Sequence, residues 1–206
     1  NVYDFSLGNP NTPPPQEINR IILDILQNES PTFVHGYMSN AGYEDVRGAI
    51  AESINRKFNT SFGEQNILMT TGAAGGLNVI LKTLLDPEDE VIAFAPYFVE
   101  YRSYTENYGG KLVVVPPDIT DFQPNLEKFE ELLTSRTKAV IVNSPNNPTG
   151  VVYSEDTIIR LAEILRKAQR KFNANIYIIA DEPYRELVYD GVFVPYIPLY
   201  YENTIV

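Results

Sequence analysis

The chain has 206 residues, of which 44% are hydrophobic, and a formal net charge of −11 at pH 7. Its size allows a full core, while the acidic balance without a long basic run argues against a nucleic-acid-binding surface. The absence of cysteine excludes disulfides, thiol catalysis and cysteine-ligated metal sites, and we predict no metal site. No apolar stretch reaches the roughly 18 residues that span a bilayer, and the N-terminus lacks the pattern of a signal peptide. We therefore expect a cytoplasmic protein without a membrane segment.

The N-terminal third predicts an extended segment followed by helices. Residues 1–15 are rich in proline and should be extended. Residues 16–27 place isoleucines and leucines at helical spacing, which predicts an amphipathic helix. A glycine-bounded aromatic loop at 35–43 precedes a second predicted helix at 44–58.

The stretch TTGAAGG at residues 70–76 should open a helix over 77–85, after a predicted strand at 66–69. A helix N-terminus presents unpaired N–H groups and partial positive charge, and small residues allow a phosphate to approach them. Close helix packing also selects glycine and alanine, so this alternative stays open. The stretch is not G-x-G-x-x-G and no P-loop lysine follows, which disfavours nucleotide binding.

Strand and helix patterns alternate through the rest of the chain. We predict strands at 90–94, 111–115, 139–142 and 176–179, the start of another strand at 205–206, and helices at 97–108 and 126–133. A long amphipathic helix should begin at Ser154. Such alternation is typical of an α/β fold with three α/β/α layers, a mostly parallel sheet and right-handed crossovers.

Polar side chains follow two of these strands. The loop NSPNNPTG at 143–150 follows the β-branched strand at 139–142, and ADEPY at 180–184 follows the strand at 176–179. Ligands of parallel α/β sheets bind just beyond the carboxyl ends of the strands. We therefore expect the functional site there.

Together, NSPNNPTG, TTGAAGG and ADEPY resemble the aspartate aminotransferase family, the class I/II enzymes of fold type I that use pyridoxal 5′-phosphate (PLP). The resemblance covers nearly the whole chain. It implies that residues 16–206 are a partial PLP-binding large domain, incomplete at its C-terminal end, and that residues 1–15 cross over the active site.

The resemblance also implies a role for each matching residue. The amides of Ala73 and Ala74 would hold the cofactor phosphate, and Phe98 would stack on the pyridine ring. Asp181 would pair with the ring nitrogen, and Asn147 with a tyrosine would contact the ring oxygen. Core packing for the phenylalanine and a turn-capping role for the aspartate remain alternatives.

Three further residues complete the implied site. Tyr184 is the tyrosine at the ring oxygen. Tyr37 would reach across a homodimer interface to the phosphate of the partner's cofactor, although an aromatic residue in such a loop is often only packed on the surface. Gly8 would offer backbone contacts to the substrate, unless the segment is a plain linker.

In the family, a lysine holds PLP as a Schiff base. No lysine of this sequence occupies the matching place, and we expect it beyond Val206. We therefore predict that the chain is an inactive fragment of an aminotransferase that transfers amino groups between amino acids and 2-oxo acids. Three alternatives stay open: a carbon–sulfur β-lyase or decarboxylase on the same fold, a PLP-binding regulatory domain of a transcription regulator, and a nucleotide-binding α/β domain.

Overall fold

The computed structural model describes residues 12–206 of the chain. Gly8, the predicted substrate contact, lies outside the described residues. The chain divides into two compact units, Asn1–Leu68 and Met69–Val206, and each is described by itself. The predicted division between residues 1–15 and a domain over residues 16–206 stays a prediction.

The first unit is helical. It contains α1 (Gln16–Asn28), α2 (Pro31–Val34), α3 (Glu44–Phe58) and the short 3₁₀ helix η1 (Glu64–Asn66), so the helices predicted at 16–27 and 44–58 are confirmed. The Asn55 side chain fastens the chain after α3, because its Nδ2 donates to the Phe62 carbonyl at 2.8 Å and its Oδ1 accepts from the Phe62 amide at 2.8 Å.

The strand predicted at residues 66–69 is wrong. The backbone at Ile67 is extended, with φ −110° and ψ 130°, as its β-branched side chain favours. However, a strand also requires a neighbouring strand to pair with, and no other segment of residues 12–206 pairs with this one. Asn66 instead closes η1 by accepting a hydrogen bond from the Gly63 amide at 3.0 Å.

The second unit is a parallel sheet covered by helices. Its strands lie in the order β2-β1-β3-β4-β5, and all four neighbouring pairs are parallel. The strands are β1 (Glu90–Phe94), β2 (Lys111–Val115), β3 (Thr137–Asn143), β4 (Tyr177–Asp181) and β5 (Thr204–Ile205). The helices are α4 (Gly72–Leu84), α5 (Glu100–Glu106), α6 (Leu126–Leu132), α7 (Glu155–Phe172) and the 3₁₀ helix η2 (Ile197–Leu199).

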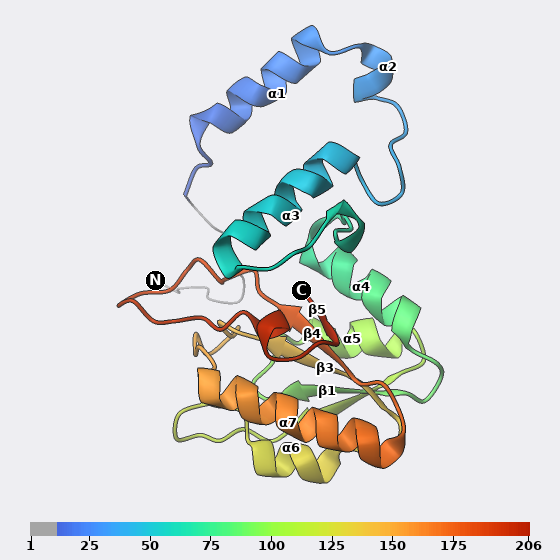
Figure 1. Ribbon diagram of the computed structural model, residues 1–206, viewed down its shortest axis with the longest axis vertical. Helices are drawn as coiled ribbons and strands as arrows, with labels where there is room; N and C mark the ends of the chain where they lie inside the picture. The colour runs from blue at the N-terminus through green and yellow to red at the C-terminus, as the bar shows by residue number, and fades with distance from the viewer. Residues whose placement is uncertain (1–11) are drawn as a thin grey trace, which may run out of the picture. The chain divides into compact units, whose positions relative to one another are not determined.

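Alternate side chains of the strands supply two separate cores, one on each face of the sheet (Figure 1). On β1, Ile92 packs with α6 and α7, while Val91 packs with α4 and α5. The period of two in a strand sends neighbouring side chains to opposite faces. The predicted α/β/α layering and parallel sheet are therefore confirmed.

Several element boundaries differ from the predictions. Helix α4 begins at Gly72, before the predicted start at residue 77, and β3 extends beyond the predicted 139–142 at both ends. The helix expected at 97–108 is shorter, because α5 begins only at Glu100 and ends at Glu106. Strand β4 extends further than the predicted 176–179, since Asp181 still pairs with Asn143 at the end of β3. Asp181 is thus fixed by the sheet itself, whereas the sequence placed it after the strand.

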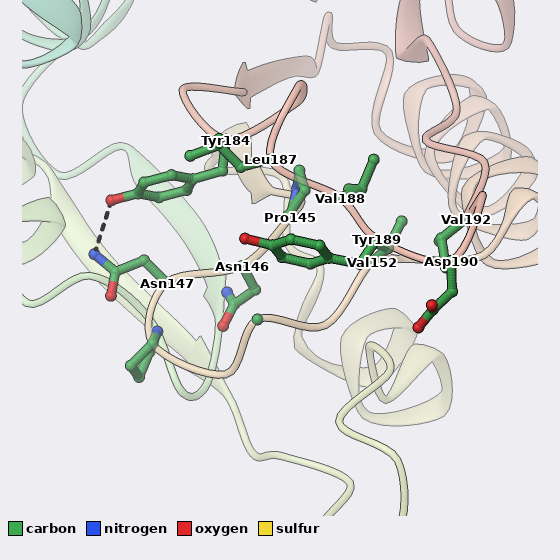
Figure 2. A pocket seen from close by; sticks show the side chains of 12 residues that line it. Pro145, Asn146, Asn147, Val152, Tyr184, Leu187, Val188, Tyr189, Asp190 and Val192 are labelled. Atoms are coloured by element: carbon green, nitrogen blue, oxygen red, sulfur yellow. Dashed lines mark hydrogen bonds between the residues drawn. The ribbon is translucent and has the colours of Figure 1, made fainter. Parts of the chain in front are cut away.

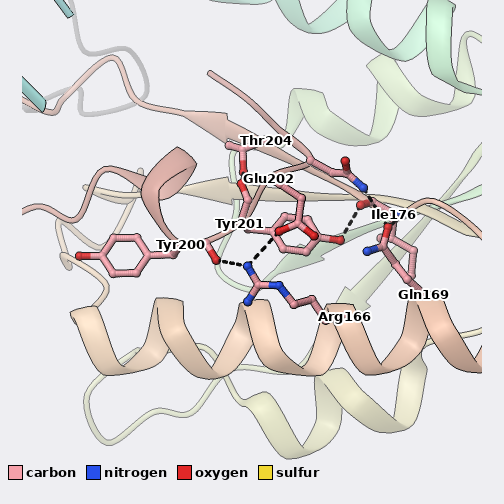
Figure 3. A network of polar contacts seen from close by, with 8 residues as sticks. Arg166, Gln169, Ile176, Tyr200, Tyr201, Glu202 and Thr204 are labelled. Atoms are coloured by element: carbon pink, nitrogen blue, oxygen red, sulfur yellow. Dashed lines mark hydrogen bonds and ion pairs between the residues drawn. The ribbon is translucent and has the colours of Figure 1, made fainter. Parts of the chain in front are cut away.

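The long helix α7 begins directly after Ser154, where the sequence predicted its start. The Ser154 side chain accepts from the Thr157 amide at 3.1 Å as an N-cap. Arg166 of this helix also holds the chain that leads into β5, since it donates to the Tyr200 carbonyl at 2.6 Å and pairs with Glu202 at 2.9 Å (Figure 3). The edge strand β5 is therefore anchored by side chains as well as by its ladder.

Within residues 12–206, none of the helices combines the length and the apolar character that crossing a membrane requires.

Candidate active site

The order of the strands creates a crevice at the carboxyl edge of the sheet. The chain moves from β1 outward to β2, then returns to the other side of β1 as β3. The loops that leave β1 and β3 therefore diverge, and ligands of open α/β sheets bind at such a switch point. A cavity of about 230 Å³ lies there. Six of the predicted site residues line it: Ala73, Ala74, Phe98, Asn147, Asp181 and Tyr184.

The N-terminus of α4 forms one wall. The helix starts at Gly72, whose φ of +70° suits a residue without a Cβ. The side chain of Thr71 does not cap the helix, and the N–H groups of a first helical turn have no partners within the helix. The exposed Ala73 and Ala74 thus present backbone donors and the positive end of the helix dipole to the cavity.

The loop after β3 is fixed by two buried asparagines. The Asn143 side chain donates to the Asp181 carbonyl at 2.8 Å and accepts from the Asn147 amide at 2.7 Å, so it joins the ends of β3 and β4. Asn146 Oδ1 accepts from the amide and the hydroxyl of Thr149, at 3.1 and 2.8 Å. The Asn147 side chain is therefore presented by a loop whose backbone is already held.

Asp181 faces the cavity from the end of β4. Burial raises its pKa above the ordinary value for an aspartate, and the hydrogen bond from Tyr101 opposes that rise. Tyr101 Oη donates to Asp181 Oδ2 at 2.5 Å. No salt bridge within residues 12–206 involves this carboxylate, so it is a partly buried negative charge without a cationic partner there.

A buried ion pair holds the loop that carries Tyr184. The guanidinium of Arg185 pairs with both carboxylate oxygens of Glu182 at 2.6 Å and donates to the carbonyls of Val194 and Pro195 at 3.0 and 2.7 Å. The two charged side chains are only 12% and 7% exposed. The Tyr184 hydroxyl lies 3.5 Å from Asn147 Nδ2, so both polar groups point to one place.

A second, larger cavity of about 570 Å³ adjoins this pair of residues. Figure 2 shows the Tyr184 hydroxyl directed at the Asn147 amide, with Tyr189 and Val192 on the following loop. Leu187, Tyr189 and Val192 are exposed by 64%, 79% and 48%. The smaller cavity is the one that Asp181 and the N-terminus of α4 share with Asn147 and Tyr184.

Tyr37, the other predicted site residue that the structure describes, is not among the residues that line this cavity. Tyr37 belongs to the first unit, where it is fully exposed in the loop after α2. Gly8 lies outside the described residues. In the part of the chain that the structure describes, no three histidine, aspartate or glutamate side chains gather as metal ligands would.

Two functional candidates escaped the sequence analysis. Tyr101 and Asn143 both line the cavity and both bind Asp181. Tyr101 lies three residues after Phe98, and the i, i+3 spacing of a helical turn would have placed the two aromatic rings side by side. Asn143 opens the NSPNNPTG loop, but its bond to the neighbouring strand depends on strand pairing that the sequence does not display.

The chain is similar to known aminotransferases. The family model for aminotransferase class I and II matches residues 1–201. The aspartate aminotransferase of Thermotoga maritima is 36% identical over 193 residues, which are 93% of this chain and 48% of that protein. The probable aspartate/prephenate aminotransferase of Thermus aquaticus is 38% identical over 157 residues, 75% of this chain and 39% of its own.

A solved structure is similar to the chain as well. An aminotransferase from Eubacterium rectale superposes with a TM-score of 0.97 at 46% identity, and the match covers 99% of this chain and 52% of that one. The chain thus spans about half the length of these relatives. On the family match over residues 1–201 and on this likeness, the chain belongs to the class I and II aminotransferases.

Proposed function

We propose that the whole protein carrying this chain is a PLP-dependent aminotransferase, which moves an amino group between an amino acid and a 2-oxo acid. The observation that carries the proposal is the gathering of six predicted cofactor contacts around one cavity. These residues come from α4, from the loops after β1, β3 and β4, and from the end of β4. They are far apart in the sequence and meet only in the fold.

The groups around the cavity fit PLP in charge and shape. The open N-terminus of α4 suits a phosphate, and the half-buried Phe98 offers an aromatic face to a planar ring. Asp181 suits a protonated ring nitrogen, because a positive charge there would stabilise its partly buried carboxylate. Asn147 and Tyr184 bring an amide and a phenol to one point, where a ring oxygen would accept from them.

When bound, PLP supplies an electron-withdrawing ring that stabilises negative charge at the substrate Cα. The chain's own part is to bind and orient that ring. Asp181 would keep the ring nitrogen protonated, and the Asn147 and Tyr184 donors would stabilise negative charge on the ring oxygen. None of the lysines within residues 12–206 lines the cavity. The Schiff-base lysine therefore stays a prediction for a segment outside this chain.

The homodimer and the substrate of the whole protein are also part of this proposal. We expect a homodimer in which Tyr37 of each copy contacts the phosphate in the other's site, and the full exposure of Tyr37 in the first unit is compatible with that role. The cytoplasmic location also stays a prediction. Several relatives are named aspartate aminotransferases, so aspartate is the first amino acid to assay.

The test uses the complete protein, expressed from its full coding sequence and loaded with PLP. Borohydride reduction followed by peptide mass spectrometry should find one modified lysine. The protein should convert aspartate and a 2-oxo acid into the exchanged pair, and the Asp181→Asn variant should do so far more slowly. Release of a thiol from a thioether amino acid, or of carbon dioxide, would identify the lyase or decarboxylase alternatives. Retention of ATP or NAD without PLP would contradict the proposal.

A further inference from the structure

The carboxylate of Asp181 is held by a residue to which no role has yet been given. We infer that Tyr101 is a positioning residue: its hydroxyl engages one oxygen of Asp181 and leaves the other for the ring nitrogen of the cofactor. This inference rests on the proposed function and extends it to a residue behind the cofactor contacts.

The geometry separates the two oxygens of the carboxylate. Tyr101 Oη donates to Oδ2 at 2.5 Å, within the range of a charge-assisted O–H···O⁻ bond. Among residues 12–206, no other side chain donates to this carboxylate, and no buried side-chain oxygen lacks a partner. Because Asp181 lines the cavity, Oδ1 is the oxygen that stays open to it. One oxygen is thus fixed by the protein and the other is free to bind.

Tyr101 is itself immobilised by packing. Its side chain is 1% exposed and belongs to the core between the sheet and α4. Its ring meets Phe98 edge-on, with centroids 5.7 Å apart and planes at 79°, and stacks on Tyr97 at 6.4 Å. The same ring therefore supports both Phe98, expected at the cofactor's face, and Asp181, expected at its nitrogen. A movement of Tyr101 would displace both contacts together.

The effect of burial on the pKa of Asp181 is opposed by the hydrogen bond from Tyr101. Burial raises the pKa of this carboxyl, and the Tyr101 hydrogen bond lowers it. Burial, followed by the charge of Asp181, also raises the pKa of Tyr101 well above its ordinary value, so the phenol keeps its proton. The other titratable groups that interact with this pair are the phenols of Tyr104, Tyr153 and Tyr184. Tyr101 is thus the group that favours the ionised form of Asp181 against the larger effect of burial.

A proton shared between Asp181 and the ring nitrogen makes this role measurable. A donor at Oδ2 lowers the proton affinity of the carboxylate, so the proton stays on the nitrogen. Without that donor the proton shifts towards Asp181 and the nitrogen loses positive charge. No bond to carbon changes in this step, because a single proton moves between two atoms.

The experiment compares Tyr101→Phe with a matched variant, Tyr201→Phe. Tyr201 is also 1% exposed and donates through its hydroxyl to the Ile176 carbonyl at 2.7 Å, but it lies in the core on the other face of the sheet (Figure 3). Each variant removes one buried hydroxyl and keeps the ring. The complete protein is loaded with PLP that carries ¹⁵N in its ring, and the nitrogen resonance, the Kd for PLP and the Tm are measured.

We expect Tyr101→Phe to move the ¹⁵N resonance towards that of an unprotonated pyridine and to raise the Kd about tenfold, the effect of losing one charged hydrogen bond. Tyr201→Phe should lower the Tm comparably and leave both cofactor readouts unchanged. If the wild-type protein binds PLP and Tyr101→Phe matches Tyr201→Phe in resonance and Kd, this inference alone is overturned. If the wild-type protein does not bind PLP, the proposed function fails and takes the inference with it.

A second measurement applies if Tyr101→Phe does not fold. In the wild-type protein loaded with PLP, the Tyr101 hydroxyl proton should resonate downfield of an ordinary hydroxyl and exchange slowly with solvent, as expected for a buried, charge-assisted bond to a carboxylate. A fast-exchanging proton at an ordinary hydroxyl position would overturn the inference.

Discussion

The two ends of the parallel sheet use the same kinds of polar residue in opposite ways. Before β1, the Glu88 carboxylate pairs with Lys111, and Asp89 pairs with Lys138 at 3.3 Å. The Glu88 and Lys111 side chains are 55% and 60% exposed. At the carboxyl end, Asp181 is partly buried and bound by a neutral phenol. Carboxylates at the first end already have cations, whereas the carboxylate at the second end has none among the described residues.

This difference shows where the molecule is prepared for a ligand. An ion pair as exposed as that of Glu88 and Lys111 is screened by water and contributes little to folding. A buried, unpaired carboxylate opposes folding, and its retention makes sense where a ligand supplies the missing cation. Backbone donors at the α4 N-terminus lie on the same cavity and complement a phosphate. The proposed cofactor carries both charges.

The largest effect should follow from changing the charge at the carboxyl end. In the complete protein, Asp181→Asn keeps the shape of the side chain but removes the charge that would hold the ring nitrogen protonated. We expect kcat/KM for transamination to fall on the order of 10³-fold, the scale of losing one preorganised electrostatic contact. The matched variant at the amino end, Asp89→Asn, should retain wild-type kinetics. Equal losses in both variants would remove the distinction between the two ends.

The buried ion pair beneath the site should give the next largest effect. Arg185→Met leaves the Glu182 carboxylate buried without its bidentate partner, and breaking such a pair costs about 3–5 kcal/mol of unfolding free energy. Arg166→Met is the control, since the Arg166 and Glu202 side chains are 38% and 60% exposed. Urea unfolding of both variants measures the difference. A loss in Arg185→Met no larger than in the control would show that the Tyr184 loop does not depend on the pair.

The sequence predicted the sheet and most of its covering helices because their signals are local. The β-branched run at 139–142 and the helical spacing after Ser154 each lie within one element. The strand at 66–69 failed for the converse reason. Its residues favour an extended backbone, but a strand also depends on a partner elsewhere in the chain.

In the candidate site, too, local signals were predicted and contacts between distant segments were missed. Family motifs identified Ala73, Asn147 and Asp181, and the fold brings them to one cavity, although their roles stay predictions. Tyr101 and Asn143 were missed because each acts through contacts about 40 to 80 residues away in sequence. A motif records the residues that recur together, whereas the groups that position them are found only when helices and strands are packed.

Substituting Asn143, at the carboxyl end of the sheet, should have an intermediate effect on stability. Asn143→Ala leaves the Asp181 carbonyl and the Asn147 amide without their buried partner, which should cost about 1–3 kcal/mol of unfolding free energy. Asn147→Ala keeps that amide bonded to Asn143 and should leave stability near wild type while weakening PLP binding. Denaturant unfolding and a PLP titration separate the two. Equal stability of the two variants would contradict the bridging role.

The smallest effects are the pH dependences of the two carboxylates, which should have opposite signs in the cofactor-free protein. Burial raises the pKa of Asp181, so the wild type should match Asp181→Asn at acid pH and lose stability relative to it as pH rises through the raised pKa. Lys111 lowers the pKa of Glu88, first through its hydrogen bond and then through its charge. Above the ordinary glutamate pKa, the wild type should therefore be slightly more stable than Glu88→Gln. It should lose this advantage as pH falls through the lowered pKa of Glu88. Thermal unfolding from pH 3 to 8 measures both difference curves. Curves with the same slope would mean that Asp181 is as well paired as Glu88, and the carboxyl end would then need no cation from a ligand.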